Sequence, residues 1–125
     1  MLIDRQKIAD DIHKGVAIPT TGPFFPFSPA HDQSIKGWAY DVDRALELLA
    51  DAGVVDVDGD RLLDYTPEGS DEPVQFKFRY AHHTARTYHS KIAVKIKEYM
   101  AKVGIEVTPA PDAISSISSR LTSAW

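Results

Sequence analysis

A strand–helix–strand pattern in the second half of the chain constrains the fold most strongly. Residues 74–80 alternate apolar and polar side chains with a period of two, which is typical of a strand with one buried face. Apolar residues then recur at helical spacing from about residue 85 to residue 103, and Gly104 ends this helix. Residues 105–108 follow as a second strand. The pattern predicts two parallel strands joined by a right-handed helical crossover.

Two shorter helices are expected in the first half of the chain. One covers residues 4–13, where Gly15 can adopt the left-handed conformation that ends a helix. The other begins at an N-cap supplied by Asp41 or Asp43 and ends at Gly53. Its apolar stripe consists of Ala45, Leu48, Leu49 and Ala52. Both helices need a partner surface on which to pack.

A loop of unusual composition separates these two helices. Residues 16–37 contain four of the eight prolines and show little periodicity, so we expect an ordered loop that lies across the domain. Phe24, Phe25 and Phe27 stand between its prolines. Rigid aromatic side chains of this kind can line a ligand pocket or pack one lobe on another, and the alternative is that they cover the domain's own core. They are the candidate ligand-binding residues of the chain.

The remaining segments suggest a hairpin and a final helix. Residues 61–65 can pair with residues 74–80 in a two-stranded hairpin. Pro109 and Pro111 are expected to break the strand that begins at residue 105, because proline lacks the amide hydrogen of a strand ladder. A serine-rich helix is expected over residues 113–125. Its apolar side would consist of Ile114, Ile117, Leu121 and Trp125.

Composition excludes several classes of function. The chain of 125 residues is 43% hydrophobic and can form one globular unit with its own core. It has no cysteine, which excludes disulfide scaffolds, thiolate zinc sites and thiol nucleophiles. The net charge of −4 provides no general surface for nucleic acid. No serine lies in a Gly-x-Ser-x-Gly motif, and no glycine-rich phosphate loop is present.

Four carboxylates cluster in the segment from Asp56 to Asp64, and calcium prefers clustered oxygen ligands. They belong to Asp56, Asp58, Asp60 and Asp64. An EF-hand counted from Asp56 would need glycine at its sixth position and glutamate at its twelfth, where Arg61 and Pro67 stand. We therefore favour a hydrated Asp-Gly turn over a calcium site.

His82, His83 and His89 form a second candidate group for metal binding, because neutral imidazoles bind zinc, nickel and copper. Their spacing does not match the HExxH motif, in which two histidines lie four residues apart on one helical face with a glutamate between them. We favour the interpretation that these histidines are polar residues at a strand-to-helix junction. A small metal-dependent enzyme that uses them is kept as an alternative.

The segments between residues 4 and 53 carry a set of motifs in a fixed order. The first helix has an acidic residue, an arginine and an isoleucine as Asp4, Arg5 and Ile8. The loop carries Gly15, Pro19, Thr21, Gly22, Pro23, Pro26, Ser28 and Pro29, and the second helix carries Tyr40, Asp41, Leu48, Leu49, Ala52 and Gly53. In this order the segments resemble one lobe of the family 5 extracellular solute-binding proteins, the oligopeptide, dipeptide and nickel receptors of bacterial ABC importers, which usually have proline where Val42 stands.

This resemblance implies an α/β fold of mixed α+β character: a three-layer-like lobe of a type II periplasmic-binding-protein fold with a β-hairpin and a β-α-β unit. Residues 1–125 would form a single domain, part of one lobe. The full-length receptor would bind peptides or a similar small solute between this lobe and the remaining lobe, and would deliver it to an ABC permease. It would be no enzyme, would need no cofactor and would not bind nucleic acid. It would be periplasmic or a cell-surface lipoprotein, with its signal upstream of Met1.

A third hypothesis is a free-standing interaction domain, in which exposed apolar surfaces would form a homodimer interface. The motifs that carry the resemblance do not mark the residues that set ligand specificity, so the sequence leaves the ligand open.

Overall fold

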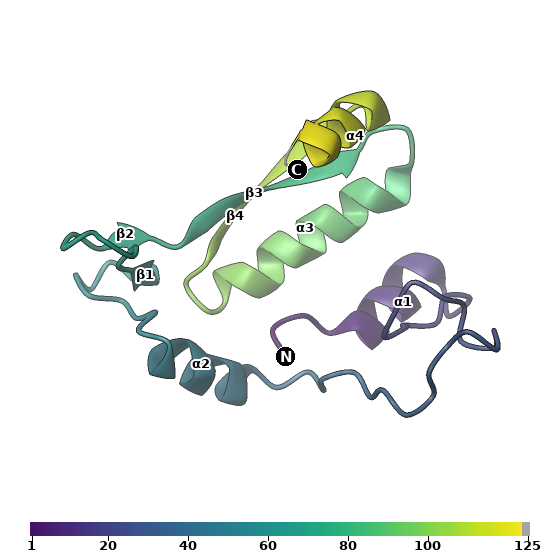
Figure 1. The fold of residues 1–125 in the computed structure, drawn as a ribbon, viewed down its shortest axis with the longest axis horizontal. Coiled ribbons are helices and arrows are strands. Elements are labelled where there is room, and N and C mark those ends of the chain that lie inside the picture. The colour runs from purple at the N-terminus through teal and green to yellow at the C-terminus, as the bar shows by residue number, and fades with distance from the viewer. Residues whose placement is uncertain (124–125) are drawn as a thin grey trace.

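The computed structural model describes residues 1–123, and in this part of the chain helices and strands follow one another in a mixed α/β order (Figure 1). The elements are α1 (Arg5–His13), α2 (Val42–Asp51), β1 (Asp64–Tyr65), β2 (Val74–Gln75), β3 (Lys77–His83), α3 (Thr87–Ala101), β4 (Glu106–Asp112) and α4 (Ile114–Ser123). None of the helices in the described residues is both long enough and apolar enough to cross a membrane.

The predicted β-α-β unit is confirmed. Strands β3 and β4 pair in parallel from Lys77 opposite Glu106 to His83 opposite Asp112, and α3 connects them. The first predicted strand is divided at Phe76, whose amide donates a hydrogen bond of 2.6 Å to the carbonyl of Leu63. The residues before Phe76 form β2, which pairs antiparallel with β1 in the predicted hairpin. The residues after Phe76 belong to β3 and pair with β4.

The prediction that Pro109 and Pro111 break the last strand is wrong, because β4 continues through both residues to Asp112. The carbonyl of Asp112 accepts a hydrogen bond of 3.1 Å from the amide of Thr84, so Asp112 directs its backbone groups toward β3. Successive residues of a strand direct these groups to opposite sides. The two prolines therefore face the outer edge of β4, where a missing amide hydrogen removes no bond to β3.

The core lies where α3, the β3–β4 sheet and α2 meet. Val103, Ile105 and Val107 form its buried centre. The partly buried residues packed around this centre are Leu2, Val42, Leu49, Leu63, Phe76, Tyr80, Ile96 and Met100. Ala93 in α3 is fully buried. The predicted apolar face of α3 covers this sheet. The predicted stripe of α2 is only partly buried: Ala45 is buried and Leu49 packs against the core, whereas Leu48 is 41% exposed and Ala52 is exposed.

Local hydrogen bonds set the helix ends. The side chain of Asp4 accepts a bond of 2.8 Å from the amide of Lys7, and Asp41 caps α2 through the amide of Arg44 at 2.9 Å. Of the two caps considered for α2, Asp41 is the one used. Helix α4 forms within the predicted range. Of its predicted apolar side, Trp125 and the side chains of Ile114 and Leu121 lie outside the part of the chain that the structure describes.

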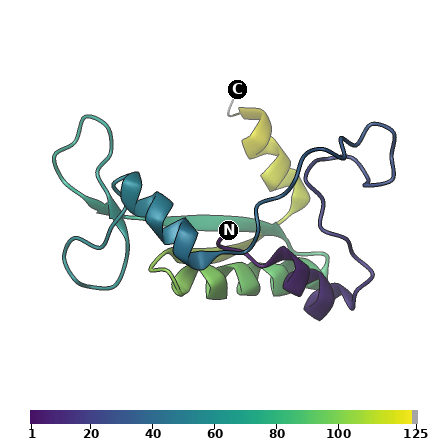
Figure 2. The ribbon, with the colours of Figure 1, turned by 90° about the horizontal axis from the view of Figure 1, so that it is seen from below.

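The elements are arranged in layers around the parallel strands. Helix α3 lies on one side of the β3–β4 sheet and α4 on the other (Figure 2). Helix α1 packs against α3. The α1–α2 loop and the loops around β1 and β2 extend from opposite ends of the molecule (Figure 2). At its end of the molecule, the α1–α2 loop is therefore the part of the chain that projects furthest from the core.

Candidate functional site

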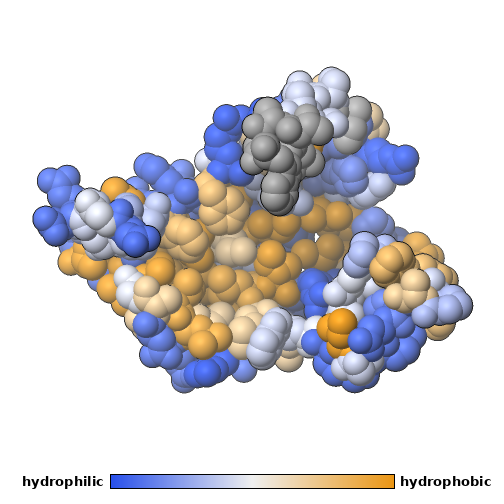
Figure 3. Space-filling view, in the orientation of Figure 1, coloured by the Kyte–Doolittle hydropathy of each residue, from blue (hydrophilic) through white to orange (hydrophobic). Residues whose placement is uncertain are grey.

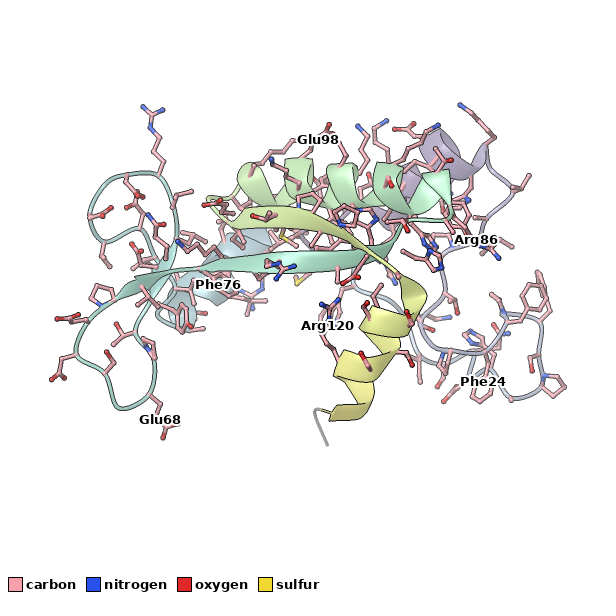
Figure 4. The ribbon with its side chains drawn as sticks, turned by 90° about the horizontal axis from the view of Figure 1, so that it is seen from above. Phe24, Glu68, Phe76, Arg86, Glu98 and Arg120 are labelled. Atoms are coloured by element: carbon pink, nitrogen blue, oxygen red, sulfur yellow. The ribbon has the colours of Figure 1, made fainter. Side chains whose placement is uncertain are left out.

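The α1–α2 loop presents its three phenylalanines to solvent. Phe24, Phe25 and Phe27 are 52%, 65% and 75% exposed, and the rings of Phe25 and Phe27 meet edge to face with centroids 5.3 Å apart. The interpretation that these rings cover the core of their own domain is therefore wrong. Figure 4 shows Phe24 at the end of the molecule opposite Glu68. The aromatic side chains are free to contact another surface.

Hydrogen bonds within the loop hold this aromatic segment in place. The amide of Ser28 donates to the carbonyl of Phe25 at 2.8 Å, and the side-chain amide of Gln33 donates to the carbonyl of Pro26 at 2.6 Å. Arg5 of α1 donates to the carbonyl of Thr20 at 3.2 Å, which ties the loop to the first helix. The loop is thus ordered as predicted, although it projects from the domain.

A negative charge is fixed near the end of this loop. The carboxylate of Asp32 accepts hydrogen bonds from the hydroxyl and the amide of Ser34 at 2.7 and 2.8 Å, and these bonds hold the pKa of Asp32 below its ordinary value. The group therefore stays ionised at neutral pH, within a few residues of the aromatic segment.

An open apolar trough of about 630 Å³ lies beside the loop. It is lined by Met1, Leu2, Ile3, Arg5, Thr21, Ile35, Lys36, Gly37, Trp38, Ala45, Leu48 and Met100. Trp38 is 78% exposed at its border. Figure 3 shows apolar atoms gathered over the hollowed middle of the molecule, between α2 and α1.

Sequence reasoning missed this trough because its walls come from segments far apart in the chain. The signal was present in the apolar residues Ile35 and Trp38, which interrupt an otherwise polar end of the loop. A groove lined by apolar residues and a few polar ones is the usual form of a ligand site or of a surface that another part of a protein covers.

The carboxylates of the acidic segment are used to shape a turn. Asp56 accepts the amides of Gly59 and Arg61 at 2.7 and 2.9 Å, one on each carboxylate oxygen. Asp64 is buried and accepts the amide of Val57 at 3.1 Å. Among the described residues, Asp56, Asp58 and Asp64 bring one oxygen each within 4.8 Å of the others. The backbone bonds account for this convergence, which supports the turn over the calcium site.

The three histidines meet around a small cavity of about 190 Å³ between β3, α3 and α4. His82 is buried, and its Nδ1 has no hydrogen-bond partner among the described residues. The ring centroids of His83 and His89 are 6.1 Å apart. The structure therefore brings the three histidines near one another. Among the described residues, however, their ring nitrogens do not come close enough together to share a metal ion, unlike the carboxylate oxygens of Asp56, Asp58 and Asp64.

The hydrogen bonding of His83 opposes a metal-binding role. Its Nδ1 accepts the amide of Ala85 at 2.8 Å, so the neutral ring carries its proton on Nε2. A metal-bound imidazole normally does the reverse, because it donates a proton from the nitrogen that does not face the metal. The His83 ring is thus held as a structural acceptor at the strand-to-helix junction.

Comparison with known proteins relates the chain to one family. Residues 1–118 match the family model described as bacterial extracellular solute-binding proteins, family 5 middle. Over 107 residues the chain is 29% identical to the oligopeptide-binding protein AppA of Bacillus subtilis (strain 168), a match that covers 84% of this chain and 19% of that protein. The chain thus spans about a fifth of the length of this relative.

Solved structures agree with the sequence matches. The structure of Bacillus subtilis AppA in complex with a nonapeptide superposes with a TM-score of 0.81 and 27% identity over 94% of this chain and 23% of that chain. An oligopeptide-binding protein from Thermus thermophilus, complexed with a pentapeptide, gives a TM-score of 0.80 at 21% identity over 93% of this chain and 19% of that chain. NikA from Brucella suis, in complex with Fe(III)-EDTA, gives 0.79 at 19% identity over 98% and 24%. The last two comparisons show a common fold.

Proposed function

Because this chain belongs to the bacterial extracellular solute-binding proteins of family 5, we propose that it is part of one lobe of a receptor that binds peptides for an ABC importer. The observation that carries the proposal is the match of residues 1–118 to the family, together with the fold shared with peptide-bound AppA. The resemblance stated from the sequence and the expected α/β fold of a periplasmic binding protein are confirmed. The metal-dependent enzyme is not supported.

The mechanism proposed for the full-length receptor is closure of two lobes around the solute. Closure excludes water from the ligand, and the closed form is the one that the permease recognises. The family consists of binding receptors, so the receptor would capture and release its ligand without covalent chemistry. Residues 1–125 would act as a single domain within one lobe, and recognition would need the remaining lobe of the same chain.

We assign the exposed aromatic segment of the loop to contacts made in the closed receptor. Phe24, Phe25 and Phe27 are exposed, and the loop that carries them is tied to α1 and by its own hydrogen bonds. Burying an exposed phenylalanine against a peptide side chain is worth about 1.5–3 kcal/mol. A rigid loop loses little conformational entropy when it makes this contact. These two properties support the segment as a ligand-contact candidate.

The family is extracytoplasmic, and for the full-length protein we propose a periplasmic location or a lipid-anchored position at the cell surface. An immunoblot of fractionated cells would test this part of the proposal. The expected result is a band several times larger than 13.9 kDa in the periplasmic or surface fraction. A cytoplasmic band near 13.9 kDa would instead favour the dimeric interaction domain.

Peptide binding by the full-length receptor tests the function itself. Calorimetry with a mixed peptide library, and mass spectrometry of peptides that copurify, should detect a bound peptide. The double variant Phe25→Ala/Phe27→Ala should weaken binding by at least about tenfold, because about 1.4 kcal/mol corresponds to a factor of ten and one buried phenylalanine contact is worth at least that much. Val57→Ala is the matched control, since Val57 is a similarly exposed apolar residue in the acidic turn. Absence of peptide binding would refute the proposed function, and an unchanged double variant would refute the role of the loop.

A further inference from the structure

Arg5 directs its charge at the α1–α2 loop. It is the first residue of α1, where a positive charge opposes the helix dipole, so stabilisation of the helix does not account for an arginine at this position. None of the ion pairs among the described residues involves Arg5. Its Nη1 instead donates to the carbonyl of Thr20 at 3.2 Å. The guanidinium therefore serves a backbone group of the loop and not a carboxylate.

The start and the end of the loop meet around this guanidinium. A Cβ at Gly37 would overlap the Nη2 atom of Arg5 and would lie 3.3 Å from the methyl group of Thr21. Gly37 does not have a positive φ, so the space taken by the guanidinium, and not the backbone conformation, is the reason for glycine here. Arg5, Thr20, Thr21 and Gly37 thus form a neck at which the loop is closed.

Hydrogen bonds lead from this neck to the aromatic segment along both limbs of the loop. On the first limb, the hydroxyl of Thr20 lies 3.3 Å from the carbonyl oxygen of Phe24, to which it can donate. On the second limb, Lys36 donates to the carbonyl of Gln33 at 3.0 Å, and Gln33 donates to the carbonyl of Pro26. A change at the neck is therefore transmitted to the phenylalanines through few bonds.

We propose that Arg5 is a positioning residue of the receptor: its guanidinium, seated over Gly37, closes the neck of the loop and holds the three exposed phenylalanines in place for contact with peptide. This inference rests on the proposed function, because it assigns the loop to peptide contact. A loop that is closed at its neck loses less conformational freedom when its tip makes a contact. Lysine could not replace Arg5, since one nitrogen cannot both bond to Thr20 and cover Gly37.

Hydrogen exchange in the full-length receptor without peptide, followed by mass spectrometry, tests the closed neck. Gly37→Ala should displace the flexible guanidinium, so the loop fragment that contains the amides of Ser28 and His31 should exchange roughly fivefold faster. Gly22→Ala is the matched control, because no atom lies within 4 Å of its added Cβ. Its loop should exchange within about twofold of the parent. Equal exchange in the two variants would overturn the proposal.

The double variant Arg5→Ala/Gly37→Ala shows whether the two residues act through one contact. Arg5→Ala removes the group that Gly37→Ala displaces, so the double variant should exchange no faster than Arg5→Ala alone. Additive effects would overturn the proposal. Fragments of the β3–β4 sheet are the internal control and should keep the exchange of the parent. Faster exchange in these fragments as well would also overturn it, because Arg5 would then support the whole fold and not the loop.

Peptide affinity tests the positioning role itself. Arg5→Ala should weaken peptide binding by roughly three- to tenfold in the parent receptor. It should have no effect in the Phe25→Ala/Phe27→Ala variant, because Arg5 acts through the rings. An equal loss in both backgrounds would overturn the proposal, since Arg5 would then contact the peptide directly. A receptor that binds no peptide, but whose loop is loosened by Gly37→Ala and not by Gly22→Ala, would refute the proposed function and leave the closed neck supported.

Discussion

The carbonyl oxygen of Gly104 accepts a hydrogen bond from the amide of Leu63 across 2.7 Å. This bond joins the turn after α3 to the segment that enters β1, so the hairpin and the β-α-β unit are fastened to each other at one glycine. Gly104 has φ of +74°, and a Cβ at this position would lie 2.7 Å from the carbonyl oxygen of Arg61. Backbone conformation and space both require glycine here.

Gly104→Ala should lower the free energy of unfolding by about 2–4 kcal/mol, because a left-handed backbone strain adds to a clash with a main-chain oxygen. Gly15→Ala is the matched control, since Gly15 has φ of +77° but no atom within 4 Å of the added Cβ. The control should lose only about 1 kcal/mol. Urea unfolding measures both values, and equal losses would show that the contact with Arg61 does not matter.

Asp41→Ala should destabilise the protein by about 1 kcal/mol through loss of the α2 N-cap. Asp43→Ala removes a carboxylate from the same turn that makes no cap, so it should cost only about 0.3 kcal/mol from the helix dipole. The two variants are compared by thermal unfolding. A larger loss for Asp43→Ala would mean that the cap is wrongly assigned.

Stability should fall in acid partly through Asp112. The hydrogen bond from the Arg120 guanidinium, followed by that from the amide of Ala113, lowers the pKa of Asp112 from its ordinary value of 3.8. Because the pKa of Asp112 is lower in the folded protein than its ordinary value of 3.8, this carboxylate stabilises the fold at any pH above about 3.8. That stabilisation is lost as the pH falls through the lower pKa of the folded protein. Unfolding followed from pH 7 to pH 2 should show a smaller acid-dependent loss for Asp112→Asn. Identical pH profiles would contradict the assignment.

The direction of the backbone groups in β4 makes a further prediction. Ala110→Pro should cost about 1–3 kcal/mol or more, because it removes an amide that points at β3. Pro111→Ala should change stability by less than about 1 kcal/mol, since residue 111 faces the outer edge. Urea unfolding of the two variants tests the register, and equal losses would indicate that the prolines do not face outward.

Calcium should have no effect on the acidic turn. Added calcium or EDTA should leave the melting temperature unchanged, because the carboxylates of Asp56 and Asp64 already bind backbone amides. Asp64→Asn should lower the melting temperature in the presence or absence of calcium, since Asp64 is buried and accepts the amide of Val57. A melting temperature that rises with calcium in the parent protein, and not in Asp56→Asn, would establish a metal site instead.

Periodicity and capping chemistry determined the elements of this protein. The alternation before Tyr80, the helical repeat through Tyr99 and the glycine at position 104 are local patterns, and they predicted the parallel β-α-β unit. The sequence also limited the N-cap of α2 to two candidates, Asp41 and Asp43, because a cap depends only on a few atoms of neighbouring residues. The order of the first-helix, loop and second-helix motifs is also enough, from the sequence alone, to indicate the family.

Only the tertiary structure decided which strand edge each residue faces, which side chains are buried, and which distant residues they contact. Phe76 divides one predicted strand because Leu63, distant in sequence, accepts its amide. Pro109 is tolerated because its side of β4 faces away from β3, a matter of register. Phe25 projects from the domain, and the apolar trough assembles from separated segments. Spacing along a chain encodes local geometry, whereas burial and strand pairing depend on contacts between distant residues, and these are set when the whole chain packs.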